Sequence, residues 1–302
     1  MNATPRILLP FNFTEGCVAA LRYASQLATY WKADLVLLHC IGENQLTPTY
    51  QSTLLTRLRS YTDRFASGLT GTRFCVVRAG NLLENLPSVV QNHHVNLMVA
   101  AADLVVGSVA QKEVLSLSAF TGCPMLLVPS EAVFQPLKEI VFALDVTDTD
   151  AKILEQVQNL AQLFKARLTL LHLYGNIDSL TLCRMEKAAS ELKQRMTYPH
   201  VSIVSQEEED LLEGLNDFAK LYAPDLFVIA TRDTHLLQEY FSGRYRKTGA
   251  YHLHTPLLNV YQARKTPCSG SCLHCKSRHH HHAPKTSAVQ ELESLVIPRE
   301  EN

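Results

Sequence analysis

The sequence has no excess of charge of either sign and no long apolar run. Its 28 lysines and arginines nearly balance 29 aspartates and glutamates, so the formal net charge is −1. No uniform field therefore attracts nucleic acid or an acidic membrane surface. No stretch of about 18 uncharged apolar residues could span a membrane, and no basic segment followed by an apolar run marks a signal peptide. We predict a cytoplasmic protein that binds neither nucleic acid nor membrane.

The chain also lacks the local motifs of common enzymes. It contains no G-x-S-x-G, no H-E-x-x-H and no intact phosphate loop, and no nucleophile stands beside a recognisable base. Five of the eight cysteines are scattered singly through apolar segments, which is typical of reduced thiols rather than of a disulfide framework. We therefore expect a protein that is not an enzyme.

What the sequence does contain is an internal repeat. The segment from Ile7, ILLPFNFTEGCVAALRYASQLATYWKADLVLLHC, aligns without a gap with the segment from Ile140, IVFALDVTDTDAKILEQVQNLAQLFKARLTLLHL. Later segments match in the same order, VNLMVAA with PDLFVIA and GCPMLLV with HTPLLNV. The sequence therefore contains two copies of one unit. We predict two domains, 1–133 and 134–263, followed by a tail, 264–302.

Each unit alternates strand-like and helix-like segments. ILLPF and LVLLHC are short apolar runs typical of buried parallel strands. Between them Thr14 is placed to cap a helix whose apolar residues recur at helical spacing, and a second helix is expected at about Tyr50 to Leu69. Because parallel strands need crossover connections, this order predicts an α/β fold with helices on both faces of a parallel sheet.

These features resemble the universal stress protein family in its tandem two-domain form. The resemblance covers about residues 5–262 and rests on an N/D-x-[ST] turn after the first strand (Asn12 to Thr14, Asp145 to Thr147), the LLH strands and the closing [CT]-P-[LM]-L strands. It implies two doubly wound five-stranded sheets of order 3-2-1-4-5, the fold of adenine nucleotide alpha hydrolases. It also implies a link to survival under stress, and pairing through the last strand, within the chain or in a homodimer. Any ligand is expected at the switch point between the first and fourth strands.

Some members of this family bind ATP, and those carry G-x2-G-x9-G-[ST] after the fourth strand, where bare backbone must approach the phosphates. In the second repeat Ala230 and Asp233 stand at the first two glycines, Gly243 keeps the third, and Arg244 replaces the Ser/Thr. Asp233 would face the phosphates, and a like-charge contact at about 4 Å costs about 1 kcal/mol in water and about 4 kcal/mol at an intermediate dielectric. Classical ATP binding is therefore not expected.

Some parts of the family's nucleotide site remain. Gly107 and Ser108 look like the end of the motif in the first repeat. Asp145 keeps the aspartate that contacts the nucleoside in ATP-binding members, whereas Asn12 replaces it in the first repeat. The resemblance thus leaves a remnant of the nucleotide site in each unit.

A basic cluster and two repeated histidines lie near the expected ligand site. Arg244 and Arg246 stand beside Gly243, and guanidinium groups suit phosphate, although a solvated helix face is the simpler interpretation. His39 and His172 close the second strand of each unit. Their repeated placement predicts a structural role, such as a hydrogen-bonded strand end, rather than catalysis.

The tail has a different composition from the repeats. Cys268, Cys272, Cys275 and His279 form C-x3-C-x2-C-x3-H, four ligands that suit one tetrahedral zinc ion or another soft transition metal. Structural zinc sites usually join two separated ligand pairs, so a tail whose metal affinity is incidental stays the alternative. A short amphipathic segment, SAVQELESLVIPREEN, closes the chain.

Two hypotheses follow from these observations. In the first, the chain is a non-catalytic stress-response protein that binds an unknown protein partner or small ligand, with no certain cofactor and a tail that holds metal. In the second, it is a nucleotide-binding stress protein with weak ATPase or switch activity. The lost glycines and Asp233 favour the first.

Overall fold

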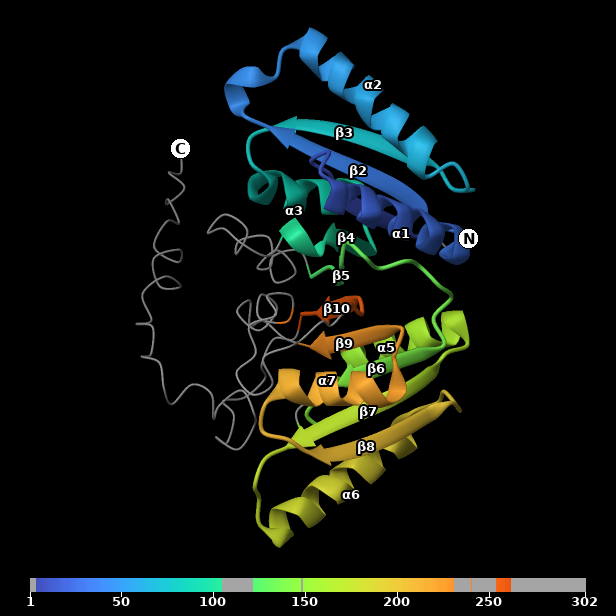
Figure 1. Cartoon of the computed structure of the whole chain (residues 1–302), viewed down its shortest axis with the longest axis vertical. Coiled ribbons are helices and arrows are strands. Elements are labelled where there is room, and N and C mark those ends of the chain that lie inside the picture. Colours follow the sequence, from blue (N-terminus) through green and yellow to red (C-terminus); the bar gives the residue numbers. More distant parts are fainter. Residues whose placement is uncertain (1–3, 105–121, 148, 231–239, 241–253, 262–302) are drawn as a thin grey trace, which may run out of the picture. The chain divides into compact units, whose positions relative to one another are not determined.

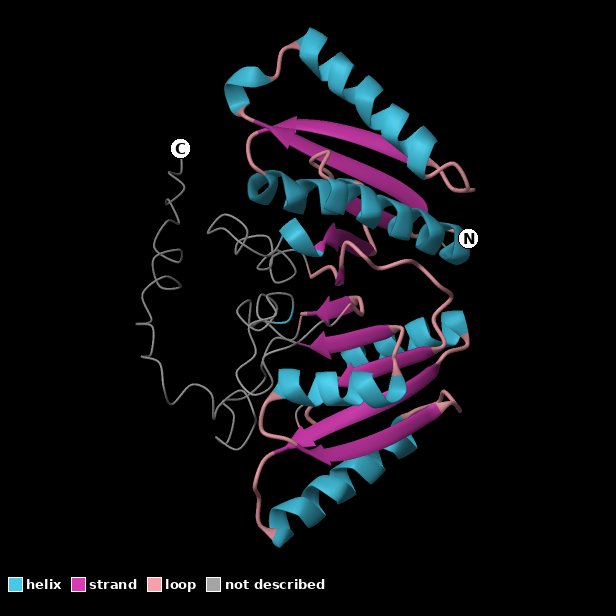
Figure 2. Cartoon of the chain, viewed as in Figure 1, coloured by secondary structure: helices cyan, strands magenta, loops and turns pink. Residues whose placement is uncertain are grey.

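The computed structural model describes residues 4–104, 122–147, 149–230, 240 and 254–261, and these residues form the predicted α/β architecture (Figures 1 and 2). The first repeat contains β1 (Arg6–Pro10), α1 (Glu15–Trp31), β2 (Asp34–Ile41), α2 (Pro48–Phe65), β3 (Arg73–Ala79), α3 (Leu82–Asn92), β4 (Leu97–Ala101) and β5 (Met125–Val128). The second contains β6 (Glu139–Ala143), α5 (Ala151–Phe164), β7 (Arg167–Tyr174), α6 (Ser179–Arg195), β8 (Val201–Glu207), α7 (Leu211–Tyr222), β9 (Leu226–Ala230) and β10 (Leu257–Val260). Two short 3-10 turns follow β2 and β4, at Glu43–Gln45 and Ala102–Leu104.

The strand order confirms the predicted doubly wound topology. The sheet runs β3-β2-β1-β4-β5-β10-β9-β6-β7-β8, so each half has the order 3-2-1-4-5. All neighbours within a half are parallel. Short apolar strands such as β1, four of whose five residues are buried, are what a sheet covered on both faces requires.

The two halves are joined into one sheet by their last strands. β5 and β10 pair antiparallel, with Leu126 opposite Leu258 and Leu127 opposite Leu257. All four side chains are buried. We call this pairing the seam. The domain boundaries at 133 and 263 stay predictions.

One large apolar cluster fills one face of the sheet. It joins residues of α1, α2, α5 and α6 with alternate strand residues such as Ile7, Leu35 and Ile140, all fully buried. The buried residues of α3 and α7 fall outside this cluster. Gly214 of α7 lies so close to Leu173 of β7 that an added Cβ would overlap the leucine side chain unless that side chain moved. Helices therefore cover both faces.

Equivalent residues end the first helix of each repeat. Lys32 after α1 and Lys165 after α5 both have a left-handed backbone, with φ of +56° and +55°. The backbone N–H of each donates to a carbonyl of the preceding turn, that of Ala28 or Ala161. This is the usual way for a helix to end in a tight turn before a strand. The equivalence of the two repeats, aligned from the sequence, thus extends to individual backbone hydrogen bonds.

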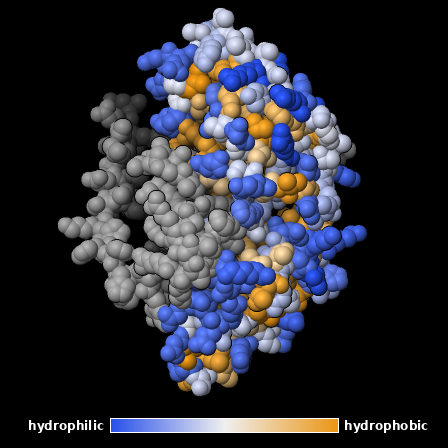
Figure 3. All heavy atoms as spheres, viewed as in Figure 1, coloured by the Kyte–Doolittle hydropathy of each residue, from blue (hydrophilic) through white to orange (hydrophobic). Residues whose placement is uncertain are grey.

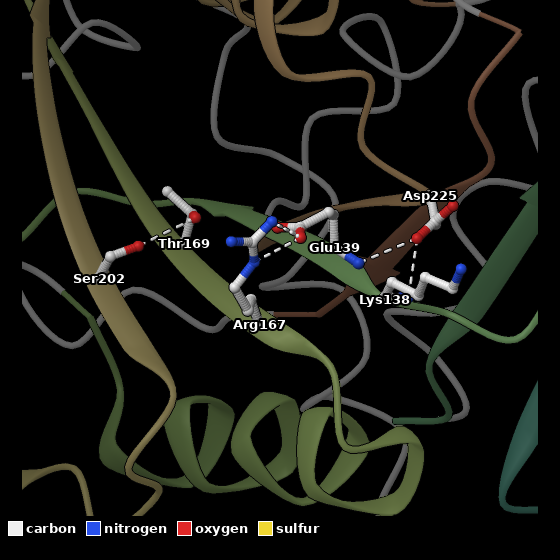
Figure 4. Close-up of polar contacts among 6 residues, drawn as sticks. All are labelled: Lys138, Glu139, Arg167, Thr169, Ser202 and Asp225. Atoms are coloured by element: carbon white, nitrogen blue, oxygen red, sulfur yellow. Dashed lines mark hydrogen bonds and ion pairs between the residues drawn. The ribbon is translucent and has the colours of Figure 1, made fainter.

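Equivalent hydrogen bonds also hold the start of the first strand in each half. Asn96, before β4, accepts through Oδ1 from the backbone N–H of Arg6, at 2.9 Å. Asp225, before β9, accepts through Oδ2 from the backbone N–H groups of Lys138 and Glu139, at 2.7 and 2.9 Å. Figure 4 shows the Asp225 carboxylate pointing at these two residues. These contacts fix where the first and fourth strands of each half begin to pair.

The described surface carries apolar residues in small groups. Figure 3 shows separate hydrophobic groups between hydrophilic residues on the visible face. Leu221 is one exposed example, with a relative accessible area of 74 % for the residue. Among the helices that the structure describes, none is both long enough and apolar enough to cross a membrane.

Candidate functional site

The first candidate site lies where β1 ends, at the carboxyl edge of the first half of the sheet. β1 lies between β2 and β4, which makes this edge the switch point where such folds bind ligands. The chain turns here through Asn12, whose Oδ1 accepts hydrogen bonds from the backbone N–H and the hydroxyl of Thr14, at 3.2 and 2.7 Å. The Thr14 oxygen in turn accepts from the N–H of Cys17 and caps α1, as the sequence predicts.

Phe13, in the middle of this turn, has a left-handed backbone with φ of +65°. That conformation costs a large side chain on the order of 1–2 kcal/mol, so packing must offset it. The ring packs edge-to-face on Phe11, His39 and Tyr61, with centroid separations of 5.2, 4.8 and 5.3 Å. The guanidinium carbon of Arg57 lies 4.2 Å from the ring centre. We call these five side chains the aromatic cluster.

The two repeated histidines close the second strand as predicted. His39 Nδ1 lies 2.7 Å from the carbonyl oxygen of Phe11, and His172 Nδ1 lies 3.3 Å from that of Leu144, the equivalent residue. A carbonyl oxygen only accepts, so Nδ1 carries the proton in both rings. His172 is buried, and its Nε2 lies 3.5 Å from the sulfur of Met185. The prediction of a hydrogen-bonded strand end is confirmed.

Asp103 brings a negative charge to the start of α1. It follows β4, and its carboxylate lies so close to Gly16 that an added Cβ would overlap it. The amino end of a helix carries partial positive charge and attracts anions. Here the protein's own carboxylate lies beside that end. An anionic ligand that approached the start of α1 would meet Asp103 first.

The equivalent turn in the second half follows β6. Asp145 Oδ1 accepts hydrogen bonds from the backbone N–H and the hydroxyl of Thr147, at 2.9 and 2.7 Å. Within the part of the chain that the structure describes, no hydrogen bond reaches its other oxygen, Oδ2. Val146 stands in place of Phe13 and is buried. This site has a free carboxylate oxygen and no aromatic ring at its centre.

Most of the other predicted site residues lie outside the described residues. These are Gly107, Ser108, Gly243, Arg244 and Arg246 of the nucleotide site. The same holds for the four tail ligands, Cys268, Cys272, Cys275 and His279. In the described ranges, no group of three or more His, Cys, Asp or Glu residues could hold a metal ion. The metal prediction therefore concerns the tail alone and stays a prediction.

Comparison with known proteins identifies the fold of the chain. No protein-family model and no curated protein matches the chain. Among solved structures, a universal stress protein from Archaeoglobus fulgidus DSM 4304 matches 85 % of this chain and 96 % of its own, with 12 % identity and a TM-score of 0.60. A protein from Pseudomonas aeruginosa UCBPP-PA14, described as a universal stress protein, matches 86 % and 94 %, with 17 % identity and a TM-score of 0.54. The chain has the universal stress protein fold.

This fold also occurs outside free-standing stress proteins. The cytoplasmic domain of a prokaryotic cation chloride cotransporter matches 85 % of this chain and 95 % of its own, with 13 % identity and a TM-score of 0.55. At such low identities the likeness shows the fold alone. The likeness therefore names no ligand for this chain, and the chemistry of any site must be argued from its own residues.

Sequence reasoning did not find the aromatic cluster or the Asp103 carboxylate. The only local signal is the order Phe11-Asn12-Phe13, which puts two large rings around the turn residue. Nothing in the sequence shows that Tyr61 and His39 meet those rings, because they come from α2 and β2. Asp103 likewise gives no signal in the sequence, because it is a single acidic residue in a segment that keeps little of the family's nucleotide motif.

Proposed function

We propose that this protein acts in stress response by binding a protein partner or a small ligand, without catalysing a reaction, and that ATP is not its ligand. The observation that carries the proposal is the aromatic cluster. At the switch point of the first half, the ring of Phe13 lies between Phe11, His39 and Tyr61. A nucleoside that entered there would have to displace that ring.

Displacing Phe13 would cost more than it releases. Its three edge-to-face contacts contribute about 0.5–1.5 kcal/mol each, beyond the area they bury. The Arg57 contact adds about 0.5–1 kcal/mol at an exposed position. Relief of the left-handed backbone returns only about 1–2 kcal/mol. The balance favours the closed cluster, and Asp103 adds charge repulsion against a phosphate.

The second half supports the alternative, a nucleotide-binding protein with weak ATPase or switch activity. Asp145 keeps one carboxylate oxygen free of described hydrogen bonds, and Val146 leaves the turn without a ring. In the sequence Gly243, Arg244 and Arg246 follow the fourth strand of this half. A nucleotide that binds without the standard phosphate loop would therefore bind in this half.

Titration of a fluorescent ATP analogue into the purified full chain tests the proposal. We expect no saturable binding in the micromolar range. Saturable micromolar binding that Gly243→Trp abolishes would overturn the proposal and support the alternative.

A matched variant tests whether the aromatic cluster is the reason for the expected lack of ATP binding. The double variant Phe13→Gly, Asp103→Asn removes the ring and the charge, and glycine suits the left-handed backbone at position 13. We expect its affinity for the ATP analogue to rise at least about tenfold, because about 1.4 kcal/mol corresponds to that factor. Equal binding by the parent and the double variant would remove the cluster as support for the proposal.

A further inference from the structure

A cavity of about 540 Å³ lies against the seam. Its floor includes Leu126 of β5 and Leu258 of β10, which are directly opposite each other in the sheet. Leu97 at the start of β4 and Leu226 at the start of β9 extend the floor to either side. All four side chains belong to the same buried cluster and so face the same side of the sheet. Neither Asn12 nor Asp145 lines this cavity, so it is separate from both switch points.

The walls of the cavity come from equivalent helices of the two repeats. Leu27 and Trp31 of α1 face it from one half, and Leu160 and Phe164 of α5 face it from the other. The sequence alignment pairs Leu27 with Leu160 and Trp31 with Phe164, just as it pairs Leu126 with Leu258. Tyr30 stacks on Phe164 at a centroid separation of 4.6 Å and links the two helices. Pairing the two last strands therefore builds one cavity with near two-fold symmetry from both repeats.

Among the described residues, the lining carries no charged side chain. The polar groups of these residues are three amides, Asn96, Gln156 and Asn159, all exposed at the rim, and the hydroxyl of Tyr23. Tyr23 has only 3 % of its area accessible, and no hydrogen bond of its hydroxyl is found among the described residues. The hydroxyl itself is not sealed from solvent, because Arg6 Nε is the only side-chain nitrogen or oxygen of the described residues that is both fully buried and without a hydrogen-bond partner. A ligand that accepts from Tyr23 in this apolar surrounding would gain one hydrogen bond.

From this arrangement we propose that the seam cavity binds an uncharged, mainly apolar small molecule with one hydrogen-bond acceptor, which receives the Tyr23 hydroxyl. The volume lies within the range of about 300–1,000 Å³ typical of ligand pockets. Water fits it poorly, since an ordered water needs two to four polar partners and, away from the amides at the rim, the described lining offers only the Tyr23 hydroxyl. A charged ligand fits poorly as well, because no opposite charge among the described lining residues offsets its desolvation.

The protonation of Tyr23 agrees with its role as a donor. Burial, and after it the negative charge of Asp225, raises the pKa of the Tyr23 phenol. The hydroxyl therefore keeps its proton throughout the physiological pH range. It donates to a ligand oxygen and does not attract a cation.

The experiment uses the full chain and the neutral fluorophore N-phenyl-1-naphthylamine as probe, at pH 8. We expect a saturable rise in fluorescence, displaced by 1-decanol at a concentration at least about tenfold below that needed for decanoate, since a tenfold ratio corresponds to about 1.4 kcal/mol. Equal potency of decanoate and decanol would overturn the proposal, because it would point to non-specific apolar binding or to a cationic site.

Two variants locate the site. Gln156→Trp puts a large ring at the rim, and we expect it to abolish probe binding, while Gln162→Trp, at an exposed position of α5 outside the lining, should bind like the parent. Tyr23→Phe removes only the hydroxyl, and we expect it to weaken decanol about two- to tenfold. Equal probe binding by the two tryptophan variants, or unchanged decanol affinity in Tyr23→Phe, would contradict the assignment.

The test of the seam cavity is independent of the test of the proposed function. If ATP binds at a switch point, it should leave the probe in place, because the switch-point residues do not line the cavity. Displacement of the probe by ATP at stoichiometric concentration would show that the two sites are one and would overturn this inference.

Discussion

Leu126 and Leu258 lie directly opposite each other where β5 and β10 pair antiparallel. They are equivalent residues of the two repeats, and both are buried. Their pairing removes one exposed edge from each half, so that β3 and β8 form the outer strands of the ten-stranded sheet. Unpaired edges invite association with other chains, and the seam satisfies these two edges within the molecule.

The seam should contribute strongly to stability. Leu257→Ala deletes buried atoms at a fully buried seam position that does not line the cavity, and we expect the free energy of unfolding to fall by about 2–5 kcal/mol. Leu221→Ala, at an exposed position of α7, should change it by less than about 0.5 kcal/mol. Urea unfolding followed by circular dichroism gives both values. Similar values for the two variants would mean that the seam is not closely packed in solution.

The turn after β6 gives a second prediction, which separates the hydrogen bonds of Asp145 from its charge as contributions to stability. Asp145→Ala removes both hydrogen bonds to Thr147 and should cost about 1–2 kcal/mol of unfolding free energy, whereas Asp145→Asn keeps an acceptor oxygen and should cost less than about half of that. Thermal unfolding measures the difference. Equal destabilisation by the two variants would show that the charge, and not the turn, is what matters.

Local features and topology could be predicted from the sequence. Thr14 was identified as the cap of α1 because a hydroxyl stood before the first apolar residues at helical spacing. The second helix, expected at about Tyr50 to Leu69, runs over Pro48–Phe65, with Thr47 as its cap. The strand order followed from the family resemblance. These features depend on neighbours in the sequence or on a pattern that occurs twice.

Two kinds of feature could not be predicted. Where the repeats differ locally, their alignment misleads, since Thr147 aligns with Thr14 and yet α5 begins only at Ala151, with Asp150 as its cap. Features that depend on distant residues are the second kind. The left-handed conformation of Phe13 is held by rings from α2 and β2, which its local sequence does not specify. The seam cavity likewise exists only once the two last strands are paired. Asn12 and Asp145 thus follow the first strand of each half, at the edge of the sheet where the resemblance predicts a ligand, while the side chains around them became apparent only in the tertiary structure.

The partly buried thiol of Cys40 and the buried thiol of Cys123 should react slowly. Burial raises the pKa of the Cys40 thiol from 9.0 to about 11 and that of Cys123 to about 12. At pH 8 Cys40 therefore has roughly a hundredth of the thiolate of an ordinary thiol, because each pKa unit is a factor of ten. We expect iodoacetamide to label the exposed Cys183 before Cys40 and Cys123, as measured by peptide mass spectrometry, with Cys183→Ser as the control. Labelling of Cys40 should speed up about tenfold per pH unit up to about pH 10, since the thiolate is the reactive form. Labelling of Cys123 as fast as Cys183 in the native protein would contradict its burial.

The tail motif predicts about one tetrahedral metal ion per chain, held by thiolate and imidazole. Elemental analysis of the purified chain should find zinc or another soft metal at that ratio, and the double variant Cys272→Ser, Cys275→Ser should lose it. Cys183→Ser, which leaves the motif intact, should keep the metal and serves as the matched control. Because the ligands must be deprotonated, the metal should be released as the pH falls below about 5. Equal metal content in the double variant and the control would mean that Cys272 and Cys275 are not ligands.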